Sequence, residues 1–418
     1  MNTFCGLDFG TSNSTIGTFI NQSCRLVPLE ADKPIMRSAI FCDGENKEWI
    51  FGQEGITRYL EGTPGRLMMA LKSVLGTTLM DDKTLIFNEM VSYADILAFF
   101  IKHLKQHAEH YTKTELTHAV LGRPVHFHDH DAEKDRDAQN TLEKIALSLG
   151  FKEVTFQYEP IAAALTYEST ITTEQLALII DMGGGTSDFS VVRLRPDSHS
   201  AYRSEDVLAN AGIHIAGTDF DQKLSLHSVM PLLGMGSMMQ GSSSVIEVPS
   251  MYYYDLTLWH TLANLYTAKT ISHVRAMQAV SHDKHLIKRL LYVLQMHGGH
   301  QILNTIETSK QRLSDVDQIT VDLDFIENEL TADITRNDFN HVIQDPVQRI
   351  IDTVLETIKI ANLKPTDINA IFYTGGSTKI PYIREQINPI FQNAKVIQGD
   401  AFGSVGLGLT MEAERRYG

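Results

Sequence analysis

Cysteine is scarce in this sequence of 418 residues. Its three cysteines, Cys5, Cys24 and Cys42, are an odd number and their spacing matches no metal-binding pattern. A disulfide framework or a zinc site would need cysteines in pairs, or cysteine and histidine at short fixed intervals. We therefore expect reduced thiols and a cytoplasmic protein.

Long apolar runs and a basic leader are also missing. Residues 1–10 contain no basic stretch, and the best apolar run, residues 176–180, has only the length of a strand. These absences argue against a signal peptide and a membrane-spanning helix.

Basic residues are also fewer than acidic ones. The sequence has 36 lysines and arginines against 51 acidic residues, which gives a net charge of −15. This balance argues against nucleic acid or an anionic membrane as the partner.

Two common nucleotide-binding loops are absent. No Gly-x-x-x-x-Gly-Lys-[Ser/Thr] segment occurs, which excludes a P-loop. No Gly-x-Gly-x-x-Gly segment leads into a helix either, because residues 183–185 run into a strand-like stretch. A phosphate-binding loop in this chain must therefore be of another type.

The sequence contains two similar strand–loop–strand segments, residues 6–20 and 179–194. In each, a short apolar strand ends in an aspartate, Asp8 or Asp181, and a turn rich in glycine and hydroxyl groups leads into a second strand. Successive N–H groups in such a turn can form an anion-binding nest. An aspartate at the end of a strand can hold Mg²⁺, mainly through retained water. Two such hairpins facing each other would hold the phosphates and metal of a nucleotide from both sides.

Helix signals flank these segments, so we expect α/β lobes with a sizeable core, since 43% of the residues are hydrophobic. Ser92 is a plausible N-cap of an amphipathic helix. Asp345 and Pro346 predict the start of another, with aspartate as the cap and proline at the first position. The inner stripe expected for the first helix is Ile96, Phe99, Phe100 and Leu104.

Four further motifs follow in a fixed order along the chain: residues 159–165 (Glu-Pro-Ile-Ala-Ala-Ala-Leu), 216–221 (Ala-Gly-Thr-Asp-Phe-Asp), 307–314, and 374–381 (Thr-Gly-Gly-Ser-Thr-Lys-Ile-Pro). With the two hairpins, they resemble the nucleotide-binding part of the heat shock protein 70 (DnaK-type) chaperone family, within the actin-like ATPase superfamily. The likeness runs almost end to end. The short C-terminus leads us to expect the YegD-like branch rather than the full-length chaperones.

The resemblance implies an actin-like ATPase (ribonuclease H-like) α/β fold, with two lobes that each carry an inserted subdomain around a central nucleotide cleft. The expected core of lobe I is residues 1–38 and 112–175, with its insert at 39–111. The expected core of lobe II is residues 176–220 and 315–418, with its insert at 221–314.

The resemblance also assigns roles to single residues. Lys72 would reach the γ-phosphate, and Glu159, Thr186 and Asp188 would complete the catalytic network, while Asp8 and Asp181 would hold Mg²⁺ mainly through water. The residues expected to bind ATP or ADP are Gly10, Thr11, Ser12, Asn13, Gly183, Gly184, Gly185, Thr186, Gly217, Glu307, Lys310, Ser314, Gly375, Gly376, Ser377, Lys379 and Asp400.

Three positions depart from the family pattern at the base site. Gln311 stands where the family has its adenine-stacking arginine, Lys379 where it usually has arginine, and Ala216 where a glycine is expected. Glutamine has no positive charge and stacks less well than a guanidinium group. We expect weaker nucleotide binding than that of a standard chaperone, or altered base selectivity.

A longer departure is the stretch from residue 221 to 306, which exceeds its counterpart in the chaperones. It includes a Gly-, Ser- and Met-rich run at 234–244, three tyrosines at 252–254 and Trp259. We interpret it as a flexible loop with an extra helical layer. The alternative is a binding surface for an unknown protein partner, since methionine and aromatic side chains supply adaptable apolar contacts.

The resemblance favours an ATP-binding, slowly ATP-hydrolysing molecular switch of the chaperone type, with ATP or ADP and Mg²⁺ as ligands. Because residue 418 closely follows the last motif, we expect no C-terminal peptide-binding domain. Two alternatives stay open: a sugar or metabolite kinase of the same superfamily, and an actin-like filament or scaffold protein.

Overall fold

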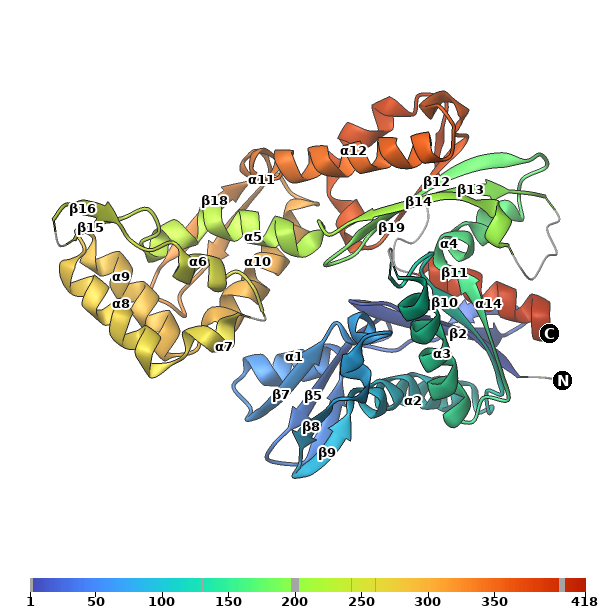
Figure 1. Cartoon of the computed structure of the whole chain (residues 1–418), viewed down its shortest axis with the longest axis horizontal. Coiled ribbons are helices and arrows are strands. Elements are labelled where there is room, and N and C mark those ends of the chain that lie inside the picture. The colour runs from blue at the N-terminus through green and yellow to red at the C-terminus, as the bar shows by residue number, and fades with distance from the viewer. Residues whose placement is uncertain (1–2, 129–130, 197–202, 242, 260, 398–402) are drawn as a thin grey trace. The chain divides into compact units, whose positions relative to one another are not determined.

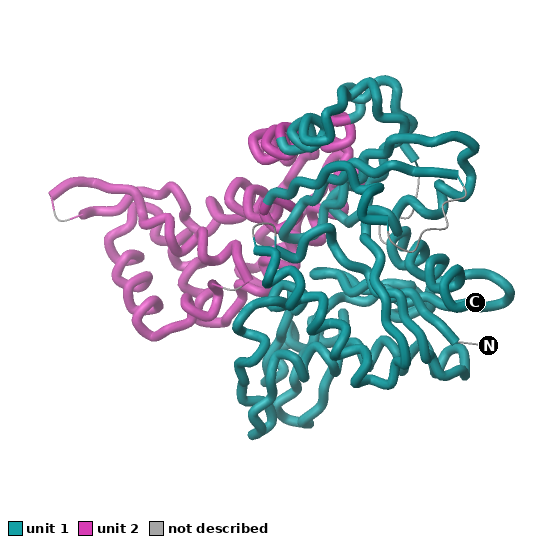
Figure 2. Tube along the Cα trace, turned by 45° about the vertical axis from the view of Figure 1, so that its right-hand side comes forward, with its two compact units in different colours: residues 1–213, 353–378, 388–418 teal, residues 214–352, 379–387 magenta. Residues whose placement is uncertain are grey.

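The computed structural model describes residues 3–128, 131–196, 203–241, 243–259, 261–397 and 403–418 (Figure 1). The chain forms two compact units, coloured separately in Figure 2. Unit 1 comprises residues 1–213, 353–378 and 388–418, and unit 2 comprises residues 214–352 and 379–387. The finer division into four subdomains stays a prediction. In the described ranges, no helix combines the length and the apolar character needed to cross a membrane.

Unit 1 contains two large sheets that repeat one topology. The first has the order β11-β10-β1-β2-β3, and the short β4 (Met36–Arg37) also pairs with β2. The second has the order β14-β13-β12-β19-β20. In each, a central strand forms an antiparallel hairpin with the next strand and pairs in parallel with a strand from much later in the sequence. The strands are β1 (Phe4–Phe9), β2 (Asn13–Ile20), β3 (Ser23–Leu26), β10 (His118–Arg123), β11 (Glu153–Tyr158), β12 (Gln175–Met182), β13 (Ser187–Leu194), β14 (Val207–Ile213), β19 (Ala370–Thr374) and β20 (Lys395–Ile397).

The repetition extends to single residues of the two hairpins. Phe9 pairs with Ser14 and Met182 pairs with Ser187, so residues 10–13 and 183–186 are four-residue loops in the same place. Asp8 and Asp181 each lie two positions before the loop on the first strand. The two predicted strand–loop–strand segments therefore occupy equivalent positions in the two sheets.

Two helices join the sheets of unit 1 into one core. Helices α4 (Glu159–Glu168) and α14 (Ser404–Tyr417) pack against each other. Their side chains share an apolar cluster with strands of both sheets, including Val120 and Ala177. Small residues allow this close approach, because a Cβ on Gly408 of α14 would overlap the carbonyl oxygen of Ala162 in α4. Helices α2 (Tyr93–Thr112) and α3 (Ala132–Ser148) contribute to a second cluster with the first sheet.

Residues 39–92 of unit 1 form a smaller layer. Strand β5 (Ala39–Asp43) pairs with β6 (Glu48–Phe51) and β7 (Gly65–Met69), and β8 (Lys83–Ile86) pairs with β9 (Glu89–Ser92). Helix α1 (Gly52–Leu60) packs on β5. Short 3-10 turns at Leu71–Val74 and Thr78–Asp81 lead from β7 to β8.

Unit 2 is mainly helical. Its helices α5 (Gly217–Ser228) and α10 (Gly299–Leu313) pack together beside the hairpin of β17 (Gln318–Asp322) and β18 (Thr331–Thr335). Helix α12 (Gln344–Ile360) runs from unit 2 into unit 1. The other elements of unit 2 are β15 (Met238–Gln240), β16 (Val245–Glu247), α6 (Met251–Asp255), α7 (Leu262–Leu265), α8 (Ala268–Val280), α9 (Lys284–Gln295), α11 (Arg336–Val342) and α13 (Pro381–Ile387).

The local helix signals are confirmed in part. Ser92 caps α2, since its hydroxyl accepts a hydrogen bond from the Asp95 amide, and Ile96, Phe100 and Leu104 are buried. Phe99 is wrong as an inner residue: it is 36% exposed and packs on the Trp49 ring instead. Asp345 is also wrong as a cap, because α12 begins one residue earlier and places Asp345 in its first turn.

Candidate functional site

The two four-residue loops approach each other within unit 1. A Cβ on Gly184 would lie 2.8 Å from the Ser12 hydroxyl oxygen, so glycine at this position allows the loops to come close. In the second loop, the Gly183 amide donates to the Thr186 carbonyl oxygen at 3.0 Å and closes the hairpin. Thr11, Gly185 and Thr186 are exposed at the loop tips. The hairpins thus present their backbone turns side by side.

Three carboxylates and one ammonium group interact with one another close to these loops. Lys72 Nζ donates to Glu159 Oε1 at 2.6 Å, and both side chains are largely buried, with 11% and 15% exposed. Asp8 and Asp181 are close enough to interact electrostatically with both residues. With all four groups ionised, two negative charges remain. A divalent cation would balance them, and carboxylate oxygens are ligands that Mg²⁺ prefers.

The excess of negative charge also contributes to the raised pKa values of the two aspartates. Burial, together with the Glu159 carboxylate, raises the pKa of Asp8 to about 8 although Lys72 opposes the rise. Burial and Glu159 also raise the pKa of Asp181 to about 6, with partial relief from the Thr374 hydroxyl and Lys72. Burial alone would lower the pKa of Lys72, but the carboxylates of Glu159, Asp8 and Asp181 outweigh it and raise that pKa. Lys72 is therefore a permanent cation at this site.

We expect Asp8→Asn to stabilise the ligand-free protein much more at pH 8 than at pH 5. The unfolded carboxyl ionises near its ordinary pKa of about 3.9, whereas the folded one keeps its proton until about pH 8. Between these values the folded state binds more protons, so wild-type stability falls as the pH rises. Urea unfolding of both proteins at pH 5 and pH 8, without nucleotide or Mg²⁺, measures the difference.

The matched control is Asp81→Asn, which changes an exposed aspartate of the same unit. It should leave the free energy of unfolding nearly unchanged at both pH values. A stability gain for Asp8→Asn of equal size at pH 5 and pH 8 would contradict the assigned cause.

Neighbouring segments support the two loops. Ser377 donates its hydroxyl hydrogen to the Gly183 carbonyl oxygen at 2.7 Å, and Gly375 has a φ of +78° next to Asp181. On the first loop, the Ser38 hydroxyl donates to the Gly10 carbonyl oxygen at 2.7 Å. Gly376 begins the 3-10 turn that carries Ser377. Ser38 was not predicted, because a single serine before a buried strand gives no pattern that links it to residue 10.

The segment that carries Lys72 is held by a histidine. His128 Nε2 forms a hydrogen bond with the Leu75 carbonyl oxygen at 2.8 Å. Gly76, with a φ of +71°, lets the chain turn beside this ring. His128, which lies in the segment after β10, thus positions the turn that carries Lys72. No sequence signal pointed to this contact, since it joins two irregular segments.

A small cavity of about 30 Å³, with both polar and apolar residues in its walls, lies at the carboxylates. Glu159, Asp181, Asp188 and Thr374 line it, together with Ser190 and Asn210. Its volume suits one or two water molecules. The Ser190 hydroxyl donates a hydrogen bond to Asn210 Oδ1 at 2.8 Å. Asp188 therefore lies on the same cavity as Glu159, as the catalytic assignment requires, although its role stays a prediction.

The predicted nucleoside-binding residues of unit 2 lie on α5 and α10. Lys310 Nζ donates to Asp221 Oδ2 at 2.7 Å and to the Gly217 carbonyl oxygen at 2.9 Å, and only 8% of Lys310 is exposed. Glu307 accepts a hydrogen bond from Gln311 at 3.4 Å, and Ser314 caps the C-terminus of α10. Lys379 is exposed, while Asp400 lies outside the described residues. The nucleoside contacts of these residues stay a prediction.

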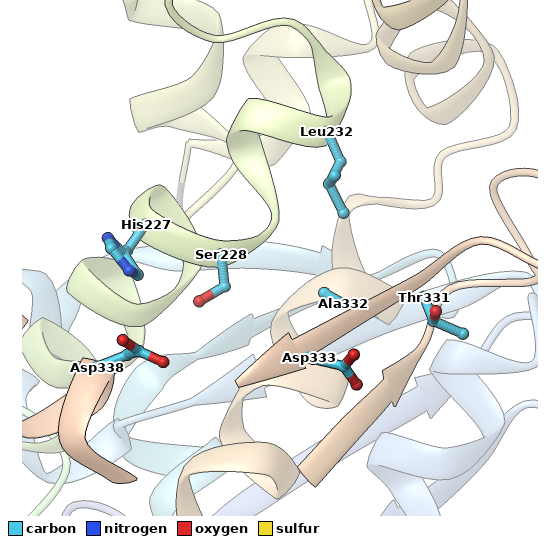
Figure 3. A pocket seen from close by; sticks show the side chains of 7 residues that line it. All are labelled: His227, Ser228, Leu232, Thr331, Ala332, Asp333 and Asp338. Atoms are coloured by element: carbon cyan, nitrogen blue, oxygen red, sulfur yellow. The ribbon is translucent and has the colours of Figure 1, made fainter. Parts of the chain in front are cut away.

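A depression of about 290 Å³ lies on unit 2 between α5 and the β17–β18 hairpin (Figure 3). His227 and Asp338 lie close together on one side of it, and Asp333 lies on the other. Both carboxylates have hydrogen-bond donors within the fold: Asp338 accepts from Thr335 and Asp333 from Thr320. We therefore assign no ligand to this depression.

Comparison with known proteins decides the family. The sequence model described as Hsp70 protein matches residues 77–232 and 295–414, which is more than half of the chain. The chain belongs to the Hsp70 family. This result confirms the predicted actin-like ATPase fold class, and the repeated sheets of unit 1 agree with it. Asp8 and Lys72 precede the matched segments, so their assignment depends on the repeated hairpin and the contacts above.

Two curated relatives of this Hsp70-family chain extend the match. Each is a chaperone protein HscA homolog from Histophilus somni, one from strain 129Pt and one from strain 2336. Each is 26% identical over 429 residues, an alignment that covers 98% of this chain and 57% of the relative. The chain thus spans little more than half the length of the curated relatives it matches.

Proposed function

We propose that this Hsp70-family protein binds ATP with Mg²⁺ at the paired hairpins of unit 1 and hydrolyses it slowly, as a nucleotide-dependent switch of the chaperone type. The observation that supports this proposal most is the buried group of Asp8, Asp181, Glu159 and Lys72 below two equivalent glycine-containing loops. Its charge deficit and its backbone turns fit a metal-bound phosphate chain.

Each group of residues would have one role in phosphoryl transfer. Positioned phosphates and neutralised charge matter more than covalent chemistry in this reaction. The loops at residues 10–13 and 183–186 would orient the β- and γ-phosphates through backbone N–H groups. Asp8 and Asp181 would hold Mg²⁺, which neutralises phosphate charge when bound. Lys72 would place its ammonium group at the γ-phosphate, and Glu159, to which it is hydrogen-bonded, would orient the attacking water.

Calorimetric titration of wild-type protein with ATP and ADP, with Mg²⁺ and with EDTA, tests the binding. We expect measurable binding that depends on Mg²⁺, with single-turnover hydrolysis slow enough to follow by manual sampling. The loop variant Gly184→Val should weaken binding, because its Cβ meets the Ser12 hydroxyl. Gly298→Val tests for nonspecific effects, because Gly298 has helical backbone angles and the nearest atoms to a Cβ there lie at 3.7–3.8 Å. Nucleotide binding that is equal with and without Mg²⁺, or absent, would overturn the proposal.

A further inference from the structure

Unit 2 carries a basic region within an acidic protein. Between residues 256 and 306 the sequence has five lysines and arginines and a single acidic residue, Asp283, although the whole chain has a net charge of −15. Helices α8 and α9 lie in this region and pack against each other (Figure 1). Most of it, residues 256–294, falls between the two segments that match the family. The charge is therefore a property of this chain rather than of the family pattern.

Three exposed side chains of α9 and its C-cap residue form one stripe. Lys284, Lys288 and Tyr292 follow each other at four-residue steps, and Met296 caps the helix one step further. Residues four apart lie on the same face of a helix. All four are exposed, with Tyr292 at 43% and Met296 at 64%. We call these four residues the α9 stripe: it begins with positive charge and ends with apolar surface.

The fold compensates these charges only in part. Lys269 and Lys284 occupy the first turns of α8 and α9, which hold no acidic residue, although Asp283 is the N-cap of α9. Positive charge at a helix N-terminus is unfavourable, because the helix dipole is positive there. Within the described ranges, Arg289 has an ion pair with Glu327 at 2.8 Å, whereas Lys288 only interacts with that carboxylate electrostatically and neither Lys284 nor Lys288 forms an ion pair. The ammonium groups of Lys284 and Lys288 therefore stay open to negative charge from a partner.

Apolar residues from a neighbouring strand enlarge the surface. The His282 amide donates to the Met238 carbonyl oxygen at 2.8 Å, which fixes β15 against the turn between α8 and α9. Met238 is 40% exposed and Val280 is 43% exposed at this turn. Exposed methionine and aromatic residues next to positive charge are typical of protein interfaces.

We propose that the α9 stripe, with Met238 and Val280, binds an acidic segment of a partner protein that also presents apolar side chains. Charge complementarity selects the acidic residues at Lys284 and Lys288, and Tyr292 and Met296 receive the apolar ones. A lipid surface fits less well, since the broad apolar face of α9, with Ile287, Leu290 and Leu294, is buried inside unit 2. Nucleic acid fits less well because the chain as a whole repels polyanions.

The test uses the full chain and three probes. The first is a fluorescent amphipathic peptide with glutamates on one face and leucine and methionine beside them, and its control peptide has lysine in place of each glutamate. The others are phosphatidylserine-containing vesicles and a single-stranded RNA. We expect the acidic peptide to bind, with an affinity that falls as ionic strength rises, and the basic peptide not to bind.

Two double variants locate the site. Lys284→Glu/Lys288→Glu should weaken acidic-peptide binding about tenfold or more, and Tyr292→Ser/Met296→Ser should weaken it without changing its salt dependence. The matched control is Lys102→Glu/Lys113→Glu, which reverses two exposed charges of unit 1 and should have no effect. The proposal is overturned if the acidic peptide fails to bind, if the α9 variants bind it as well as wild type, or if vesicles or RNA bind the stripe more tightly. None of these readouts depends on nucleotide, so failure of the proposed ATPase would leave this test valid.

Discussion

Replacing Lys72 with alanine should reduce single-turnover ATP hydrolysis by about 10²–10³-fold, the effect of losing one preorganised charge at a developing transition state. Mg²⁺-dependent binding should stay measurable, because the loop amides and the two aspartates are unchanged. Manually sampled single-turnover assays and calorimetry on the same preparations separate the two quantities. Lys83→Ala, which removes an exposed lysine of the same layer, is the matched control and should hydrolyse ATP like wild type.

A loss of activity could also come from the fold, since Lys72→Ala leaves the largely buried Glu159 without its ammonium partner. Breaking a buried pair by removing one member typically costs about 3–5 kcal/mol. The double variant Lys72→Ala/Glu159→Gln removes the unpaired charge, so we expect it to regain stability while staying inactive. Hydrolysis at the wild-type rate by Lys72→Ala would remove Lys72 from the mechanism.

Gly408→Ala should destabilise the protein by roughly 3 kcal/mol, in the upper range of overpacking changes. In an exposed helix this change would stabilise by about 1 kcal/mol, because alanine has the higher helix propensity. At Gly408 the new methyl group would overlap the carbonyl oxygen of Ala162, a backbone atom that cannot move without shifting α4. Denaturant unfolding monitored by circular dichroism measures the loss.

Gly298→Ala is the matched control for the helix crossing. Gly298 is the N-cap of α10 with helical dihedral angles, and the nearest atoms to a Cβ there lie at 3.7–3.8 Å. This variant should be neutral or slightly more stable than wild type. If Gly408→Ala behaves in the same way, the close contact between α14 and α4 is not a constraint on the fold.

The hairpins and their aspartates could be predicted because the signal is local. An apolar strand, an aspartate and a glycine-rich turn are adjacent in the sequence, and the segment occurs twice. The return strands β2 and β13 begin at Asn13 and Ser187, because pairing continues to the edge of each loop. The Lys72–Glu159 contact joins residues 87 positions apart and was reached only through the family resemblance.

Other features could not be predicted because they depend on packing. Ser38 and His128 support the site through hydrogen bonds to the backbone carbonyl groups of Gly10 and Leu75. Because any residue has such a carbonyl group, these contacts produce no recognisable sequence pattern. Phe99 fits the helical period of α2 as an inner residue, but the Trp49 ring gives it a partner at the edge of the layer. Lys310 matches a family position, yet its ion pair with the largely buried Asp221 is visible only in the structure.

The packing of α14 on β1, β2 and β10 has a consequence for synthesis on the ribosome. The first sheet is translated long before residues 404–417, which cover its apolar face next to α4. Until those residues emerge from the exit tunnel, Gly6 and Gly122 lack their neighbours Thr410 and Leu409 in α14, and the early half of the chain stays incompletely folded. Nascent chains stalled before residue 404 should therefore be cut by protease in the first sheet, and chains stalled well beyond residue 417 should resist it.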